Sequence, residues 1–203
     1  LAEDKDEAPG ALWHHAQIDA LRVKVAPPLV RVVVGVDPPG GNTEAGIVVM
    51  GKGVDGHGYV LADYSLQASP NQWAAAAVKA YQEHKADRLL GEKNYGGDMV
   101  QQTIRNVEGG QRVSYKDVVA TRGKALRAEP IAALYERGMI HHVGVFYRLE
   151  EEMCNWQPGD PKSPNRVDGM VWSATELDIV VDRTVSYETL TTRESAYTGR
   201  GAY

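Results

Sequence analysis

The run VRVVVGVD, residues 30–37, constrains the fold of this chain more than any other stretch. Its β-branched side chains favour extended backbone, and so apolar a run is typical of a strand in a protein interior. The strand ends at Asp37, and the turn-forming residues PPGG follow it. Asp is common in turns, so Asp37 could simply end the strand. The alternative is that its carboxylate stands at the edge of a sheet because it holds a positive charge there, and both interpretations stay open at this point.

The rest of the hydrophobic pattern predicts a mixed α/β domain. Strands expected at 45–52 and 58–65 follow the first one through glycine-rich turns, so three antiparallel neighbours form a meander. Helices then alternate with short strands, and the first of these helices begins at Ser69 and Pro70. We expect further strands within 87–94, 111–121 and 140–145, and helices within 11–23, 96–107, 123–140 (interrupted near Pro130), 146–156 and 166–180. This order implies a mixed sheet with helices on both faces.

Length and composition are those of one globular domain. The chain has 203 residues, of which 43% are hydrophobic and 24% charged, and no apolar run is long enough to cross a bilayer. We expect an acidic linker or tail at 1–10, one domain at 11–180 and a polar tail at 181–203. The lone Cys154 cannot form a disulfide within the chain, which favours a reducing compartment.

The charge balance excludes a generic nucleic-acid binder. The net charge is −5 and the pI is about 5.7. Carboxylates gathered to hold divalent cations would lower the total and still leave a local basic groove. Five basic residues could form such a groove and contact DNA phosphates: Lys116, Arg122, Lys124, Arg127 and Arg166. A solvated basic face explains them equally well.

Three acidic residues are candidates for a metal site. Asp37 ends the first strand, Glu92 ends the strand RLLGE, and Asp168 begins the helix in NRVDGMVW. If the two strands are neighbours, their carboxylates emerge side by side, and a helix across the same edge can add the third. Carboxylates so close repel unless cations neutralise them, and oxygen ligands alone select Mg²⁺ or Mn²⁺. Each acid also has an ordinary explanation, as a turn residue, a solvated strand end or a partner of the helix dipole.

Seven motifs follow one another along residues 11–180: VVVGVDPPGG, LADYS, GEKNYGGDMV, TRGKALRAEP, ALYERGMIHHVG, LEEEMCNW and NRVDGMVWSATEL. Together, and in this order, they resemble the nuclease domain of phage terminase large subunits. These are DNA-packaging motors whose C-terminal domain has a ribonuclease H-like fold. The blocks GEKNYGGD and RVDGMVW are the most specific part of the resemblance.

The resemblance implies a ribonuclease H-like mixed sheet in which Asp37, Glu92 and Asp168 hold two Mg²⁺ or Mn²⁺ ions, with Asp37 shared between them. It implies an endonuclease that cuts concatemeric double-stranded viral DNA during genome packaging, in the host cytoplasm at the viral prohead. The implied partners are DNA and, in a full-length protein, an N-terminal ATPase motor, the portal and the small terminase subunit. No GxxxxGK[ST] motif occurs, so we expect an excised domain without ATP hydrolysis.

Three other functions stay open. A resolvase or transposase of the same superfamily would keep the three acids and change the DNA substrate. An actin-like sugar kinase also begins with a strand, an Asp and a glycine-rich hairpin, but it needs a second lobe that about 200 residues do not accommodate. A DNA-docking module without cutting activity of its own is the non-enzymatic alternative.

Overall fold

A mixed sheet forms the centre of the computed structural model, which describes residues 7–41, 43–93, 98–160 and 164–179. Within this part of the chain the sheet has six strands in the order β5-β4-β1-β2-β3-β6. Their bounds are β1 Leu29–Asp37, β2 Gly46–Gly53, β3 Gly58–Asp63, β4 Arg88–Glu92, β5 Tyr115–Val118 and β6 Ile140–His142. Strands β1, β2 and β3 form the expected antiparallel meander, whereas β4, β5 and β6 join by parallel pairing.

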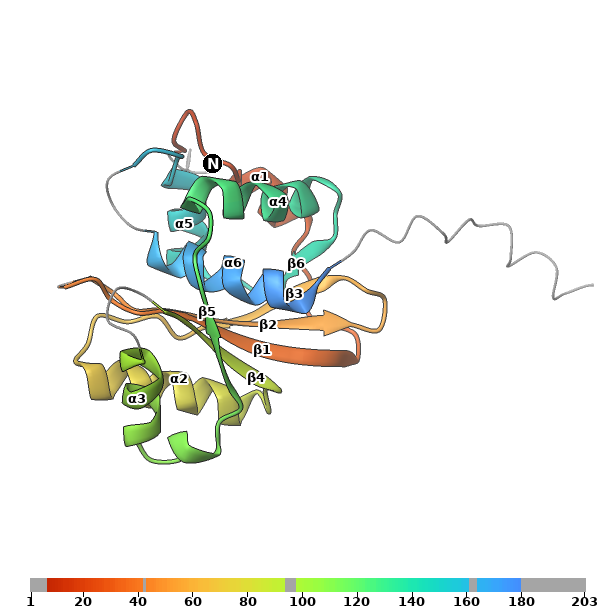
Figure 1. The fold of residues 1–203 in the computed structure, drawn as a ribbon. Coiled ribbons are helices and arrows are strands. Elements are labelled where there is room, and N and C mark those ends of the chain that lie inside the picture. Colours follow the sequence, from red (N-terminus) through yellow and green to blue (C-terminus); the bar gives the residue numbers. More distant parts are fainter. Residues whose placement is uncertain (1–6, 42, 94–97, 161–163, 180–203) are drawn as a thin grey trace, which may run out of the picture.

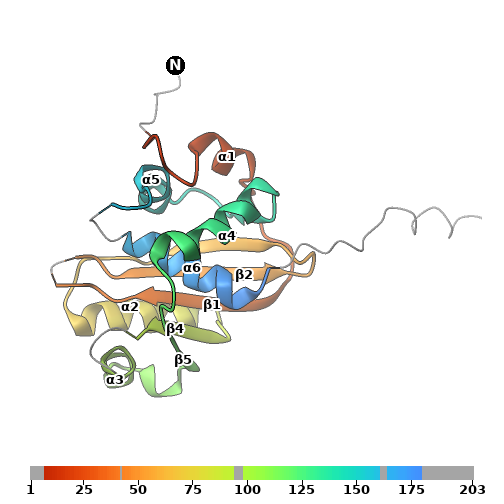
Figure 2. The same cartoon turned by 45° about the horizontal axis from the view of Figure 1, so that its top comes forward.

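Helices cover both faces of this sheet, which confirms the predicted fold class. Helices α2 and α3 lie on one face, and α6 lies on the other with α1, α4 and α5 beyond it (Figure 1). Figure 2 shows the same layers with α6 directly over β1 and β2. The bounds are α1 His15–Ala20, α2 Pro70–Glu83, α3 Met99–Asn106, α4 Lys124–Glu136, α5 Tyr147–Asn155 and α6 Asn165–Leu177, with a 3-10 turn at Gly110–Arg112. None of the helices in the described ranges is both long and apolar enough to cross a membrane.

The apolar run of β1 serves two separate cores. Val33 packs in the core between the sheet and the α6 layer. Val32, Val34 and Val36 point the other way and pack with α2 and α3. Alternate residues of a strand face opposite sides of a sheet, so a strand covered on both faces needs apolar residues at every position. This is why the hydrophobic residues of β1 form a continuous run and do not alternate with polar residues.

Helix α6 rests on the sheet with backbone against backbone. A Cβ atom added to Gly35 would lie 2.1 Å from the carbonyl oxygen of Gly169, and one added to Gly46 would lie 1.7 Å from that of Asn165. Only glycine allows so close an approach. Further along the helix, the Ser173 hydroxyl donates a hydrogen bond of 3.0 Å to the carbonyl of Val48. The first turn of α6 is therefore fixed over the ends of β1 and β2.

The structure differs from the expected elements at several boundaries. Helix α4 runs without interruption through Pro130. Proline removes the N–H that would bond to the carbonyl of Leu126, but Leu126 is 56% exposed and its carbonyl can bond to water. The strand expected within 111–121 begins only at Tyr115, because a 3-10 turn precedes it, and β6 ends at His142 rather than 145.

The proposed division into domain and tails stays a prediction. Residues 1–6 and 180–203, which make up most of both expected tails, lie outside the described residues. Near the N-terminal boundary, the Ala8 N–H donates to the carbonyl of Cys154 in α5 over 3.0 Å. The chain from residue 7 onward thus already contacts the outer helical layer.

Gly35→Ala should lower the free energy of unfolding by about 1–3 kcal/mol, because the new methyl group forces α6 away from β1. Urea unfolding followed by circular dichroism measures the change. Gly40→Ala is the matched control, since a Cβ there meets no atom within 4 Å. Equal midpoints for the two variants would contradict the backbone contact described above.

Candidate metal centre

The three acidic residues singled out in the sequence come together at one edge of the sheet. Val36 of β1 pairs with Gly91 of the parallel strand β4, so Asp37 and Glu92 occupy the next position at the carboxyl end of each strand. Asp168 lies in the first turn of α6, which crosses this edge. The three residues are 4%, 7% and 2% exposed, respectively. Three carboxyl groups from distant parts of the chain thus share a buried site.

Two basic side chains of α4 link these acids. The Lys124 ammonium forms an ion pair with Asp168 and lies 3.9 Å from Oδ2 of Asp37. The Arg127 Nη2 lies 3.5 Å from Oδ1 of Asp168, and its Nη1 lies 3.8 Å from Oε2 of Glu92. Residues three apart on a helix share a face, so the first turn of α4 presents both cations to the acids.

Trp172 holds Glu92 and Arg127 in place. Its indole Nε1 donates a hydrogen bond of 3.0 Å to Oε2 of Glu92, and the Arg127 guanidinium carbon lies 4.4 Å from its ring centroid. A cation over an indole ring is a favourable arrangement. From the sequence, Trp172 lies within an apolar helical pattern, which by itself indicates a core residue. Its spacing of one helical turn from Asp168 is the signal that could have placed it at the site.

Arg127 has hydrogen-bonding capacity that no described residue uses. Its Nε and Nη1 atoms are buried, and neither has a hydrogen-bond partner among the residues that the structure describes. Its distances to Glu92 and Asp168 are those of ion pairs rather than of hydrogen bonds. Buried donors without partners are rare because they cost free energy, so a guanidinium in this state points to an anionic ligand.

Negative charge on these acids is unfavourable in the protein alone. Burial raises the pKa of Asp37 well above its ordinary value, the charges of Asp168 and Glu92 raise it further, and Lys124 opposes them. Burial likewise raises the pKa of Asp168, again against Lys124 and Arg127. A divalent cation would remove this conflict, and a donor set of carboxylates alone fits Mg²⁺ or Mn²⁺. The residues therefore fit a hard-cation site.

A second group of possible metal ligands lies away from the three acids of the sheet edge. Among the described residues, Glu7, His15 and Cys154 are the set of three whose possible ligand atoms all lie within 4.8 Å of one another. The three acids of the sheet edge do not form such a set. Two ions that share one carboxylate do not need all three acids around a single ion. The Glu7 oxygens already bond to the His14 ring and to the N–H of His15.

The basic residues predicted to contact DNA lie in different surroundings. The Lys116 ammonium lies 2.7 Å from Oε2 of Glu176, and Arg122 is exposed. Lys124 and Arg127 face the acids. Each of these four stays a predicted phosphate contact.

Arg166 is buried and fully engaged by the sheet. Its Nη1 lies 2.5 Å from Oδ2 of Asp63, and its Nη2 lies 2.6 Å from Oε2 of Glu44. These two ion pairs link the first turn of α6 to Glu44, which precedes β2, and to Asp63 at the end of β3. The predicted phosphate contact at Arg166 is untested, and these contacts support a structural role.

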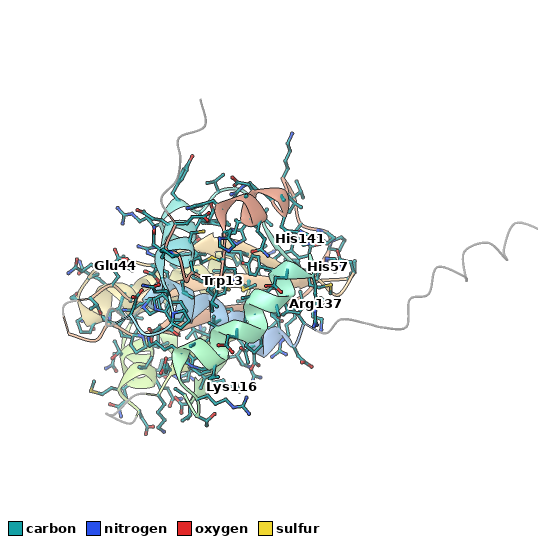
Figure 3. All side chains as sticks on the ribbon, turned by 90° about the horizontal axis from the view of Figure 1, so that it is seen from above. Trp13, Glu44, His57, Lys116, Arg137 and His141 are labelled. Atoms are coloured by element: carbon teal, nitrogen blue, oxygen red, sulfur yellow. The ribbon has the colours of Figure 1, made fainter. Side chains whose placement is uncertain are left out.

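His57 and His141 are separate from the acidic edge. Glu44 precedes β2 at the end of the sheet where Asp37 lies, and Figure 3 shows His57 and His141 at the opposite end. Their rings stack, and Nδ1 of His57 lies 2.9 Å from Nε2 of His141. No proton shuttle can be assigned to this pair.

Comparison with a protein family gives a match over most of the chain. The model of the family described as "Terminase RNaseH-like domain" matches residues 34–175. This range contains the three acids, both α4 cations and Trp172. No curated protein matches the chain.

Several solved structures with a similar fold are large terminases or terminase nuclease domains. The large terminase nuclease from thermophilic phage G20c is 10% identical with a TM-score of 0.61, covering 82% of this chain and 98% of that chain. The human cytomegalovirus terminase nuclease domain, Mn soaked and inhibitor bound, is 14% identical with a TM-score of 0.61, at 83% and 96% coverage. The large terminase from the thermophilic bacteriophage D6E is 14% identical with a TM-score of 0.57, at 83% and 42% coverage. The G20c nuclease also has structures with bound cobalt, magnesium and zinc.

In the absence of divalent metal, Asp37→Asn should raise the melting temperature at pH 7.5. A carboxyl whose folded-state pKa is raised destabilises the fold increasingly as pH rises from its ordinary value of 3.8 toward the raised value. The gain should therefore shrink as the pH falls below this ordinary value of 3.8, because there the wild-type carboxyl is protonated in both the folded and the unfolded states. The melting temperature should rise by about 2–4 °C for each kcal/mol by which the substitution increases the free energy of unfolding.

Differential scanning calorimetry across pH measures this effect. Glu129→Gln on the exposed side of α4 is the control, because it removes a charge that is not buried. A melting temperature for Asp37→Asn at or below that of the wild type at pH 7.5 would show that the carboxylate is not under electrostatic stress.

Proposed function

Because this chain belongs to the family of terminase RNaseH-like domains, we propose that it is the metal-dependent endonuclease domain of a viral terminase large subunit. It cuts concatemeric double-stranded DNA during genome packaging. The observation that carries this proposal is the convergence of three buried acids, at the carboxyl ends of β1 and β4 and in the first turn of α6. Beside them lies an arginine with buried donors that have no hydrogen-bond partner among the described residues.

The acids are the ligands of the metal centre. Asp37 would be the carboxylate shared by two ions, and Glu92 and Asp168 would each hold one. Mg²⁺ or Mn²⁺ fits a donor set of oxygens, and the divalent cations bound to the G20c nuclease and soaked into the cytomegalovirus domain support such a centre. When bound, the ions supply an activated water and neutralise the leaving oxygen of the phosphodiester.

Arg127 binds the phosphate that is cut. Its guanidinium is held over Trp172, and its Nε and Nη1 donate to phosphate oxygens beside the acids. Arginine suits this role because its planar donors match phosphate geometry. Trp172 also orients Glu92 through the indole hydrogen bond. Arg122 and Lys116 add contacts to the DNA backbone that do not depend on sequence.

The proposed partners are those of a packaging machine. DNA is the substrate, and in the full-length protein an N-terminal ATPase motor, the portal and the small terminase subunit act with the domain at the prohead in the host cytoplasm. The 42% of the D6E large terminase that this chain covers is consistent with one domain of such a protein. Residues 11–180 are the proposed nuclease unit.

Incubation of plasmid with the protein tests the activity directly. Nicking or linearisation should appear with Mg²⁺ or Mn²⁺, stop with EDTA, and fall at least ~100-fold in Asp37→Asn, because a shared ligand is lost. Glu129→Gln should cut like the wild type. Intact plasmid under every condition, with DNA still bound, would instead indicate the docking module, and cutting confined to junctions would indicate a resolvase.

Arg127→Met should reduce single-turnover cleavage by roughly 10–100-fold, since hydrogen bonds to charged groups contribute about 1.5–3 kcal/mol. The affinity for DNA should also depend less steeply on salt concentration, by the amount expected for the loss of about one phosphate contact. Arg112→Met is the matched control, because Arg112 is exposed in the 3-10 turn on the α2–α3 side of the sheet. Equal rates for both variants would remove Arg127 from phosphate binding.

A further inference from the structure

Lys124 occupies the position where a cation is needed. Its ammonium forms an ion pair with Asp168 and lies 3.9 Å from Asp37, so it faces two of the proposed ligands at once. The acids are almost completely buried, whereas the Lys124 side chain is 37% exposed. The ammonium therefore reaches the carboxylates from the solvent side, which is the side from which a metal ion must enter.

The two basic residues of α4 differ in how firmly they are held. Arg127 is 10% exposed and lies over the Trp172 ring. Lys124 is on a flexible four-carbon stem, and its exposure leaves it room to turn outward. Of the two cations, Lys124 is therefore the one that can leave the acids without unpacking the site.

We propose that Lys124 is the internal counter-ion of the three acids in the metal-free protein, and that a divalent cation must displace its ammonium in order to bind. This inference rests on the proposed metal centre. An ammonium and a divalent ion cannot share the same carboxylate oxygens without strong repulsion. Lys124 thus stabilises the empty site and weakens its affinity for metal, which makes it a regulator of metal binding by competition.

Titration of the full chain with Mn²⁺ by isothermal calorimetry tests the exchange. Lys124→Met keeps the length of the side chain and removes the charge, so it should bind Mn²⁺ roughly tenfold more tightly than the wild type. Lys79→Met is the control, because Lys79 lies on α2 on the other face of the sheet and forms an ion pair with Glu83 at 3.8 Å. Its affinity for Mn²⁺ should match that of the wild type.

Thermal unfolding gives a second readout that does not depend on activity. In EDTA, Lys124→Met should melt at a lower temperature than the wild type because the acids lose their counter-ion. Addition of saturating Mn²⁺ should raise the melting temperature of Lys124→Met by more than it raises that of the wild type. A merely structural lysine would instead lower both melting temperatures equally, and a lysine that assists metal binding would weaken the Mn²⁺ affinity.

Asp37→Asn separates failure of this inference from failure of the proposed function. If Asp37→Asn loses Mn²⁺ binding while Lys124→Met binds as the wild type does, the metal centre stands and the exchange is wrong. If neither the wild type nor Lys124→Met binds Mn²⁺, or if Asp37→Asn leaves Mn²⁺ binding unchanged, the proposed metal centre is wrong. The proposed exchange of Lys124 for a metal ion is then wrong as well.

Discussion

The backbone contact between α6 and the ends of β1 and β2 is the constraint on which the site depends. Gly35 and Gly46 remove the side chains that would hold the helix at an ordinary distance from the sheet. The helix can then place Asp168 at the edge where Asp37 ends its strand. Helices normally pack on sheets through layers of side chains, and such a layer here would separate the two carboxyl groups. The same contact therefore organises one core and creates the acidic edge.

Polar contacts fix the first turn of α6 from its other side. Arg166 reaches Glu44 and Asp63, and the amide of Asn165 bonds to the carbonyl of Glu44. Glu152 of α5 accepts the N–H of Val167 over 3.0 Å, and burial raises the pKa of Glu152 to about 7. Charged groups are buried only where partners compensate them, so these residues act as a frame for the turn that carries Asp168.

Local chemistry made part of the site predictable from the sequence. Asp37 and Glu92 end apolar runs, and parallel neighbours bring such strand ends together, so their proximity follows once the strands are recognised. The position of Asp168 depends on glycine contacts between segments more than 100 residues apart, which no local pattern encodes. Lys124 and Arg127 were expected at DNA phosphates, yet their nearest charges are the acids themselves. Trp172 is a buried residue within an apolar helical pattern, so the sequence indicates packing, whereas its hydrogen bond to Glu92 depends on the tertiary fold.

The electrostatics of the site oppose the stability of the fold. Three buried carboxyl groups are unfavourable neighbours, and the pKa values of Asp37 and Asp168 are raised as a result. A chain selected for stability alone would place apolar residues at this edge. Lys124 and Arg127 of α4 partly neutralise the acids in the metal-free protein. A divalent cation would neutralise them more completely. Sites with unfavourable buried charges are typical of functional centres, because a ligand that neutralises the charges binds more tightly as a result.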